Sequence, residues 1–186
     1  MTKVASPVDI SKALTIGGWM TPEELTWLAT MASQYDRIVE FGSLHGRSTR
    51  AMADNNQGVI YAVDPWAGEY YSEEGQKIPI STYVLPYFKR NLKDQIKLGK
   101  VVPVREFSYQ FSLPKDYLVD MVFIDGDHKY DTVVRDIKKA FELLRPGGLI
   151  SGHDYDHPNW PGVKQAVDEL VGPTLIEGTI WYAIRP

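Results

Sequence analysis

The sequence predicts an α/β protein with a Rossmann-like, doubly wound sheet of seven strands, mostly parallel and ending in an antiparallel hairpin. Three observations support this fold class. The 186 residues suit one domain of ordinary size. Short apolar runs alternate with helical patterns, which is typical of parallel strands with crossover helices on both faces. Two final strand-like runs are separated by only three residues. We therefore expect residues 1–186 to form a single domain.

The helical patterns begin with an N-terminal helical segment over residues 1–35. Within it, Thr21 and Glu24 form a capping box, and Pro22 occupies the first helical position. Apolar residues at helical spacing predict a further helix that begins at Tyr130 and ends at the stop signal Arg145–Gly148. Other helices are predicted over Ser81–Leu98, where Pro86 begins or kinks the helix, and over the pattern Val163, Ala166, Val167 and Leu170.

The strand-like runs contain consecutive apolar residues, as expected for strands buried on both faces. Five of them form the parallel part of the predicted sheet: Arg37–Phe41, Val59–Val63, Val101–Val104, Met121–Ile124 and Leu149–Ser151. The terminal hairpin joins Leu175–Ile176 to Ile180–Ile184. The stretch 66–80, which combines glycines and acids with two tyrosines, is predicted to be a loop insertion.

Composition excludes several classes of protein. With 44% hydrophobic residues the chain is too apolar for disorder, and no apolar run reaches the roughly 18 residues of a membrane span. The absence of cysteine excludes disulfides, thiolate metal sites and a cysteine nucleophile. No secretory signal is recognised, and the net charge of −4 argues against a nucleic-acid partner. We expect a cytoplasmic protein with a small-molecule partner and no membrane partner, either a monomer or a homodimer.

Ligands of doubly wound sheets bind beyond the carboxyl ends of the strands. The residues that follow the five parallel runs are therefore the candidate site. Four of these five segments carry acids or histidines close to glycines. The segments are Glu40–Gly46, Asp64–Trp66, Arg105–Ser108, Asp125–His128 and Gly152–Asp156.

The first segment is a strand-to-helix turn in which Gly42 and Gly46 allow the backbone to bend and a ligand to approach closely. A dinucleotide fingerprint needs glycine at the position of Leu44, whose side chain would crowd a pyrophosphate. The charge of Glu40 suits a cationic ligand, such as an amino group or a sulfonium. A tight turn with a solvated glutamate is the alternative.

Asp64 ends the second strand, 22 residues after Gly42. A carboxylate at this position accepts both hydrogens of a ribose diol. The feature fits any adenosine cofactor, so it does not separate nicotinamide from other nucleosides. The alternative is an aspartate that caps a helix or a turn.

Together, these motifs resemble the class I S-adenosylmethionine-dependent methyltransferases, with a resemblance that covers roughly residues 16–185. Within that class the chain is most similar to the small-molecule group of macrocin O-methyltransferases and cephalosporin-hydroxylase-like proteins. The resemblance implies methylation of a small-molecule hydroxyl, with or without the help of a metal. The alternatives are an NAD(P)-dependent oxidoreductase and a non-catalytic nucleoside-binding protein. The motifs that carry the resemblance are Glu40–Gly46, Asp64, Phe123–His128 and Arg145–Gly148.

The resemblance also implies which residues bind the cofactor. Glu40 and Gly42 would line its methionine portion, Gly46 would allow its close approach, and Asp64 would hold the ribose. Phe107 stands where the family often has a polar contact to adenine, so we expect stacking there instead. The complete predicted set is Glu40, Gly42, Ser43, Gly46, Asp64, Trp66, Phe107, Ser108 and Asp125.

The fourth and fifth segments carry the predicted chemistry. We expect the catalytic residues to be Asp125, His153 and His128. The resemblance implies that Asp125, His153 and Asp154 hold a divalent cation, Mg²⁺ or a similar ion, because oxygen and imidazole ligands suit such ions. The alternative is a metal-free site, in which the acids cap helices and a histidine removes the proton.

Overall fold

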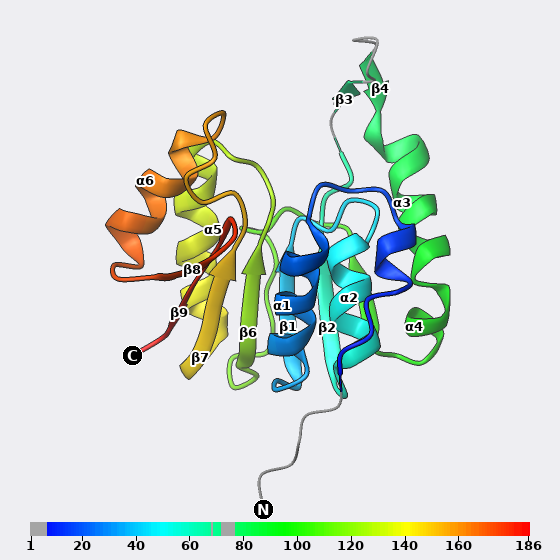
Figure 1. Cartoon of the computed structure of the whole chain (residues 1–186), viewed down its shortest axis with the longest axis horizontal. Coiled ribbons are helices and arrows are strands. Elements are labelled where there is room, and N and C mark those ends of the chain that lie inside the picture. The colour runs from blue at the N-terminus through cyan, green and yellow to red at the C-terminus, as the bar shows by residue number, and fades with distance from the viewer. Residues whose placement is uncertain (1–6, 68, 72–76) are drawn as a thin grey trace, which may run out of the picture.

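The computed structural model describes residues 7–67, 69–71 and 77–186. Its main sheet has seven strands in the order β5-β2-β1-β6-β7-β9-β8 (Figure 1). Strands β5, β2, β1, β6 and β7 are parallel, whereas β9 is antiparallel to both β7 and β8. This topology confirms the predicted Rossmann-like sheet with a terminal hairpin. The strands are β1 (Arg37–Phe41), β2 (Val59–Val63), β5 (Val101–Val104), β6 (Val119–Ile124), β7 (Leu144–Gly152), β8 (Leu175–Glu177) and β9 (Ile180–Ile184).

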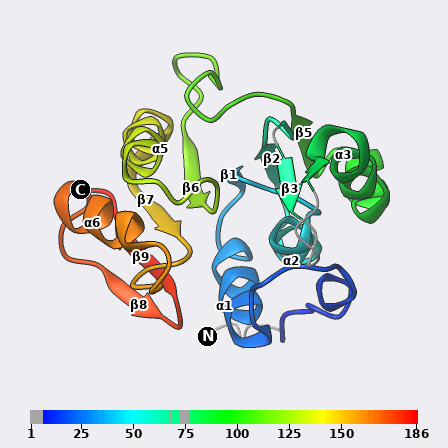
Figure 2. The same ribbon diagram turned by 90° about the horizontal axis from the view of Figure 1, so that it is seen from above.

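Helices cover both faces of this sheet (Figure 2). One apolar core contains Leu25 of α1, Met52 of α2 and Phe88 of α3, and the other contains Ile137 of α5 and Val167 of α6. The sheet is thus enclosed on both sides, which is why its strands are apolar on consecutive residues. The helices are α1 (Pro22–Ala32), α2 (Arg47–Asn55), α3 (Ile80–Asn91), α4 (Lys93–Lys97), α5 (Tyr130–Leu143) and α6 (Pro161–Leu170), with a short 3₁₀ turn at Ala13–Thr15.

Two predicted element boundaries are corrected. The helix expected over Ser81–Leu98 is divided into α3 and α4 at Leu92, whose φ of −106° and ψ of 12° are not helical. The stop signal Arg145–Gly148 lies within β7, because α5 has already ended at Leu143. Strand β7 reaches back this far since Leu144 pairs with Val119 of β6 before the register shifts.

The stretch 66–80 also differs from the predicted loop insertion. Strands β3 (Glu69–Tyr71) and β4 (Lys77–Pro79) form a two-stranded antiparallel sheet there. Tyrosine and isoleucine favour extended backbone, which accounts for local strands within an otherwise polar stretch. Residue 68 and residues 72–76 of this stretch lie outside the described residues.

Among the parts of the chain that the structure describes, no helix is both long and apolar enough to cross a membrane.

Candidate active site

The turn after β1 encloses a carboxylate. Glu40 is fully buried, and its oxygens accept hydrogen bonds from Ser43 Oγ at 2.6 Å, Ser48 Oγ at 2.5 Å and Thr49 Oγ1. Burial raises the pKa of Glu40 to about 7, and the charge of Asp125 adds to this, although the three hydroxyl donors act in the opposite direction. The structure therefore places Glu40 beneath the turn, with protein groups as its hydrogen-bond partners.

Asp64, at the end of β2, ties that strand to the turn after β1. Its Oδ2 accepts the backbone N–H groups of Ser43 and Leu44, both at 2.9 Å, and its Oδ1 accepts the N–H of Trp66 at 2.6 Å. Burial raises the pKa of Asp64, while the three N–H donors oppose that rise. The carboxylate of Asp64, which is predicted to bind the ribose, is thus held in a fixed orientation at the sheet edge.

The two glycines of this turn have packing reasons for lacking a side chain. Both have a φ of +87°, in the left-handed region. A Cβ at Gly42 would stand 2.1 Å from the carbonyl oxygen of Asp125, and one at Gly46 would stand 2.3 Å from Leu92 Cδ2. The space beside Gly46 is therefore filled by α3 and its neighbours. Contact between Gly46 and a cofactor stays a prediction.

Trp66, predicted to contact the cofactor, has a buried side chain. The indole is only 1% exposed and packs against Phe88, with ring centroids 4.9 Å apart. Its Nε1 donates to the carbonyl oxygen of Leu44 at 2.9 Å. Trp66 therefore supports the turn from inside the core, and its contact with a cofactor stays a prediction.

The turn after β5 places Phe107 and Ser108 side by side in the chain but in different surroundings. Phe107 is 45% exposed and stacks on Tyr109, with centroids 5.4 Å apart and an interplanar angle of 17°. Ser108 Oγ donates to Asp136 of α5. Sequence reasoning missed Asp136, although an acid between Val133 and Ile137 on the apolar face of a predicted helix was a usable signal.

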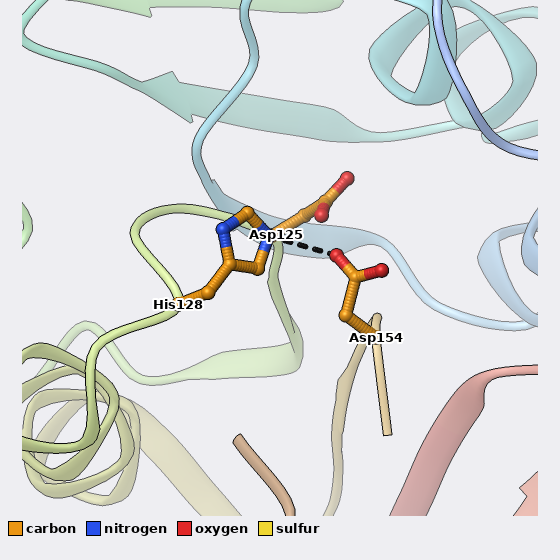
Figure 3. Close-up of side chains that lie close together, drawn as sticks. All are labelled: Asp125, His128 and Asp154. Atoms are coloured by element: carbon orange, nitrogen blue, oxygen red, sulfur yellow. Dashed lines mark hydrogen bonds and ion pairs between the residues drawn. The ribbon is translucent and has the colours of Figure 1, made fainter. Parts of the chain in front are cut away.

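At the ends of β6 and β7, three side chains form a cluster. Asp125, His128 and Asp154 each offer one ligand atom within 4.8 Å of the others, and His128 Nε2 lies 2.8 Å from Asp154 Oδ2 (Figure 3). Asp154 has a φ of +61°, an unusual backbone conformation for a residue other than glycine. The indole of Trp160 stacks on the His128 ring, with centroids 4.5 Å apart and an interplanar angle of 20°.

His153 lies behind this cluster, against three carboxylates. Its Nδ1 is 3.6 Å from Asp125 Oδ1 and 3.3 Å from Asp154 Oδ2, and its Nε2 is 3.4 Å from Glu24 Oε2. Burial alone lowers the pKa of His153, but the carboxylates outweigh it and raise the pKa to about 12. The three carboxylates therefore favour the protonated form of His153.

Two predictions concern His153, as a metal ligand and as the general base, and both stay predictions. His128 joins Asp125 and Asp154 in a cluster that suits a metal, while His153 lies 3.6 Å and 3.3 Å from the same two carboxylates. Because these carboxylates favour its protonated form, His153 is a weaker candidate for the general base than His128. Asp125 and Asp154 remain in the cluster as predicted, and His128 remains the accessible histidine.

Glu24 is a second residue that sequence reasoning missed. Its Oε2 accepts the N–H of Thr21 at 2.9 Å, and its Oε1 accepts both the N–H and the Oγ1 of Thr179. Burial raises the pKa of Glu24, but His153 and these donors outweigh burial and hold the pKa well below its usual range. The capping box was visible in the sequence, but nothing in it indicated a contact with His153.

Comparisons with known proteins agree with this architecture. A family model described as "Methyltransferase domain" matches residues 39–155. An uncharacterised protein of Acanthamoeba polyphaga mimivirus is 30% identical over 159 residues, which cover 77% of this chain and 65% of that protein. The chain thus spans about two thirds of the length of this relative.

Solved structures show the same fold at low sequence identity. A SAM-dependent O-methyltransferase from Thermotoga maritima has a TM-score of 0.65 at 16% identity, covering 98% of this chain and 72% of that one. The O-methyltransferase TomG from Streptomyces achromogenes, involved in tomaymycin synthesis and solved in complex with SAM, has a TM-score of 0.63 at 17% identity. That match covers 90% of this chain and 82% of TomG. The chain therefore belongs to the methyltransferase domain family, and its fold is similar to that of O-methyltransferases that use S-adenosylmethionine (SAM).

Proposed function

We propose that the protein transfers the methyl group of SAM to a hydroxyl oxygen of a small molecule, with the help of a divalent cation. The observation that carries this proposal is the cluster of Asp125, His128 and Asp154 at the ends of β6 and β7. The cluster adjoins the turn after β1, since Gly42 packs directly against the backbone of Asp125. A methyl donor at the β1 and β2 ends would thus lie next to an acceptor at the cluster.

Methyl transfer is an in-line displacement, so alignment of acceptor oxygen, methyl carbon and sulfur supplies much of the rate. Asp64 is our candidate for holding the ribose, since its carboxylate is fixed by Ser43, Leu44 and Trp66. The exposed face of Phe107 is our candidate for stacking on the adenine. Neither residue touches the reacting atoms, which would lie toward Asp125.

The three ligand atoms fit a divalent cation. Each side chain offers one ligand atom, these atoms lie within 4.8 Å of one another, and carboxylate and imidazole groups are ordinary ligands of divalent cations. Asp125, Asp154 and Glu24 bring three negative charges against the one positive charge of His153, so the cluster favours a cation. When bound, the ion would lower the pKa of an acceptor hydroxyl.

One imidazole among oxygen ligands favours Mn²⁺ or another transition metal over Mg²⁺. His128 is suited to this role because Trp160 fixes its ring plane and Asp154 lies beside its Nε2. The same arrangement supports the metal-free alternative, in which an imidazole oriented by a carboxylate accepts the hydroxyl proton. The two mechanisms share the acceptor and differ in whether a cation is required.

Metal binding tests the cluster without knowledge of the acceptor. In a Mn²⁺ titration followed by electron paramagnetic resonance, we expect one bound ion in the wild type and an affinity reduced about 10-fold or more in His128→Ala. His157→Ala is the matched control, since His157 lies in the loop that carries Asp154 but outside the cluster. No bound ion, together with turnover that survives chelation, would refute the metal and leave His128 as the base.

The cofactor and the acceptor require separate measurements. Calorimetry should show binding of SAM and of its product S-adenosylhomocysteine (SAH), and no binding of NAD, which would exclude the oxidoreductase alternative. An isotope-transfer assay with labelled SAM and a panel of small hydroxyl compounds should yield a labelled product. Cofactor binding without transfer to any acceptor would instead favour a non-catalytic nucleoside-binding protein.

A further inference from the structure

We infer that Asp136 of helix α5 accepts a hydrogen bond from the exocyclic amino group of the cofactor's adenine and so makes the site selective for this base. The inference rests on the proposed cofactor position, with Phe107 and Ser108 at the adenine. Under this inference, adenine is recognised by a residue of α5 and not by the turn after β5.

The position of Asp136 is unusual for an acid. It lies on the inward face of α5, beside Val133 and Ile137, and is only 3% exposed. A buried carboxylate is costly unless its oxygens have polar partners. Two apolar neighbours at helical spacing indicate that packing alone would favour an apolar side chain at this position. A polar function for Asp136 is therefore worth seeking.

The two oxygens of Asp136 have different surroundings. Oδ1 accepts the hydroxyl of Ser108, in the turn after β5. Among the residues that the structure describes, none donates a hydrogen bond to Oδ2. The Cβ that Gly126 lacks would stand 3.5 Å from Oδ2, so glycine leaves this oxygen uncovered on the side of the turn after β6. Oδ2 thus lies between the turn after β5 and the turn after β6. The proposed adenine position adjoins both turns.

Adenine differs from other bases in the groups along its edge. Stacking on Phe107 does not distinguish one base from another, because every base offers an aromatic face. Discrimination comes from the base edge, where adenine presents an amino group as donor. A carboxylate oxygen without a donor is complementary to that group, whereas a base with a carbonyl oxygen there would repel it. Buried donors and acceptors left unpaired give strong discrimination of this kind.

The electrostatics of Asp136 agree with an acceptor role. Burial raises the pKa of Asp136 to about 6, and the negative charge of Asp127 adds to the rise. The hydroxyl of Ser108 and the positive charge of Arg135 lower the pKa and only partly offset burial. The group is therefore ionised, and able to accept, at pH 8. The competing explanation is that Asp136 only ties the turn at Ser108 to α5.

Calorimetry at pH 8 with SAH and S-inosylhomocysteine separates these explanations, because the second compound carries a carbonyl oxygen in place of the adenine amino group and a proton on the neighbouring N1. We expect the wild type to prefer SAH by about 10-fold or more. Asp136→Asn removes the charge and, with its amide nitrogen at the uncovered position, presents a donor to the base, so it should bind SAH more weakly and lose the preference. Ser108→Ala removes the tie to the turn but keeps the carboxylate, so it should retain the preference.

Three results would overturn the inference. The first is equal affinity of the wild type for the two compounds, which needs no variant and so holds even if Asp136→Asn fails to fold. The second is an undiminished preference in folded Asp136→Asn. The third is loss of the preference in Ser108→Ala, which would assign discrimination to the turn. If the wild type binds neither compound, the proposed cofactor fails as well, which distinguishes that outcome from the other three.

Discussion

The candidate site has two halves, one at the ends of β1 and β2 and one at the ends of β6 and β7. The carboxylates of the two halves have different kinds of hydrogen-bond and ion-pair partners. In the β1–β2 half, Glu40 is bonded by three hydroxyls and Asp64 by three backbone N–H groups, all neutral donors. In the β6–β7 half, Asp154 faces His128 and His153. Burial consequently raises the pKa of Glu40 and Asp64, whereas imidazoles lower that of Asp154.

This difference indicates two kinds of preorganisation. Neutral donors hold the β1–β2 half in shape without attracting a counter-ion. The β6–β7 half contains more negative than positive charge, and this excess attracts a cation or a polar acceptor. The first half should therefore respond to mutation mainly through stability and cofactor affinity, and the second mainly through metal binding and turnover.

The largest expected effect breaks the contact between the halves. Gly42→Ala places a Cβ 2.1 Å from the carbonyl oxygen of Asp125, at a φ of +87°. We expect a loss of about 4 kcal/mol in the free energy of unfolding, because backbone must move. Gly172→Ala is the control: its φ is +81° but no atom lies within 4 Å. It should lose only about 1–2 kcal/mol. Equal losses in urea unfolding would contradict the role given to this contact.

The second prediction uses pH to compare Glu40 of the β1–β2 half with Glu24 of α1, whose carboxylate lies beside His153. The pKa of Glu40 is 4.5 unfolded and about 7 folded. Between these values the folded state binds more protons, so the free energy of unfolding falls by about 3 kcal/mol as pH rises from 4.5 to 7. Glu40→Gln should remove that fall.

Glu24 has the opposite sign. Its pKa is lowered on folding, so its contribution is present above about pH 4.5 and is lost as pH falls further. Glu24→Gln should therefore flatten the acidic side of the stability profile and leave the fall between pH 4.5 and 7 intact. Denaturant unfolding at several pH values measures both variants, and identical profiles would disprove the comparison.

The third prediction separates binding from turnover. Asp64→Ala should weaken SAH binding by about 1.5–3 kcal/mol, for a lost charged hydrogen-bond partner. His128→Ala should leave SAH affinity unchanged and lower kcat about 100-fold. Calorimetry and initial rates, with circular dichroism as a check on folding, distinguish the two. Reduced SAH affinity in folded His128→Ala would show that cofactor binding is not confined to the β1–β2 half.

The smallest expected effect concerns the stack on His128. Trp160→Ala removes a ring whose centroid lies 4.5 Å from the imidazole, and should weaken Mn²⁺ binding. We expect a loss of about 1 kcal/mol, the usual contribution of such a pair. Trp160→Phe keeps an aromatic face and should bind Mn²⁺ nearly as the wild type does. Equal weakening in both variants would point to a need for the indole itself.

The sequence predicted the parallel strands well because their burial on both faces leaves a clear record of consecutive apolar residues. The pattern at Arg37–Phe41 and Val59–Val63 matches β1 and β2 residue for residue. Strands β3 and β4 were missed because a short pairing among polar residues leaves no such record.

The candidate site was predicted by position but not in its detailed contacts. Topology placed Asp125 and Asp154 at neighbouring strand ends, as the structure finds. The positions of His128 and His153 depend on how two loops turn, and Trp66 is buried at a turn with a φ of +38°. Such loop conformations, like the contact of Glu24 with His153, are decided by tertiary packing that local sequence does not encode.

The bond between Glu24 and Thr179 has a consequence for the chain as it emerges from the ribosome. These residues are 155 positions apart, and β9 enters the sheet between β7 and β8 only after every parallel strand has been made. Until then β7 presents a free edge, and free edges recruit strands from other chains. A partly folded state in which β9 is unpaired would therefore expose the edge of β7, and we expect such a state to aggregate more readily than the folded protein.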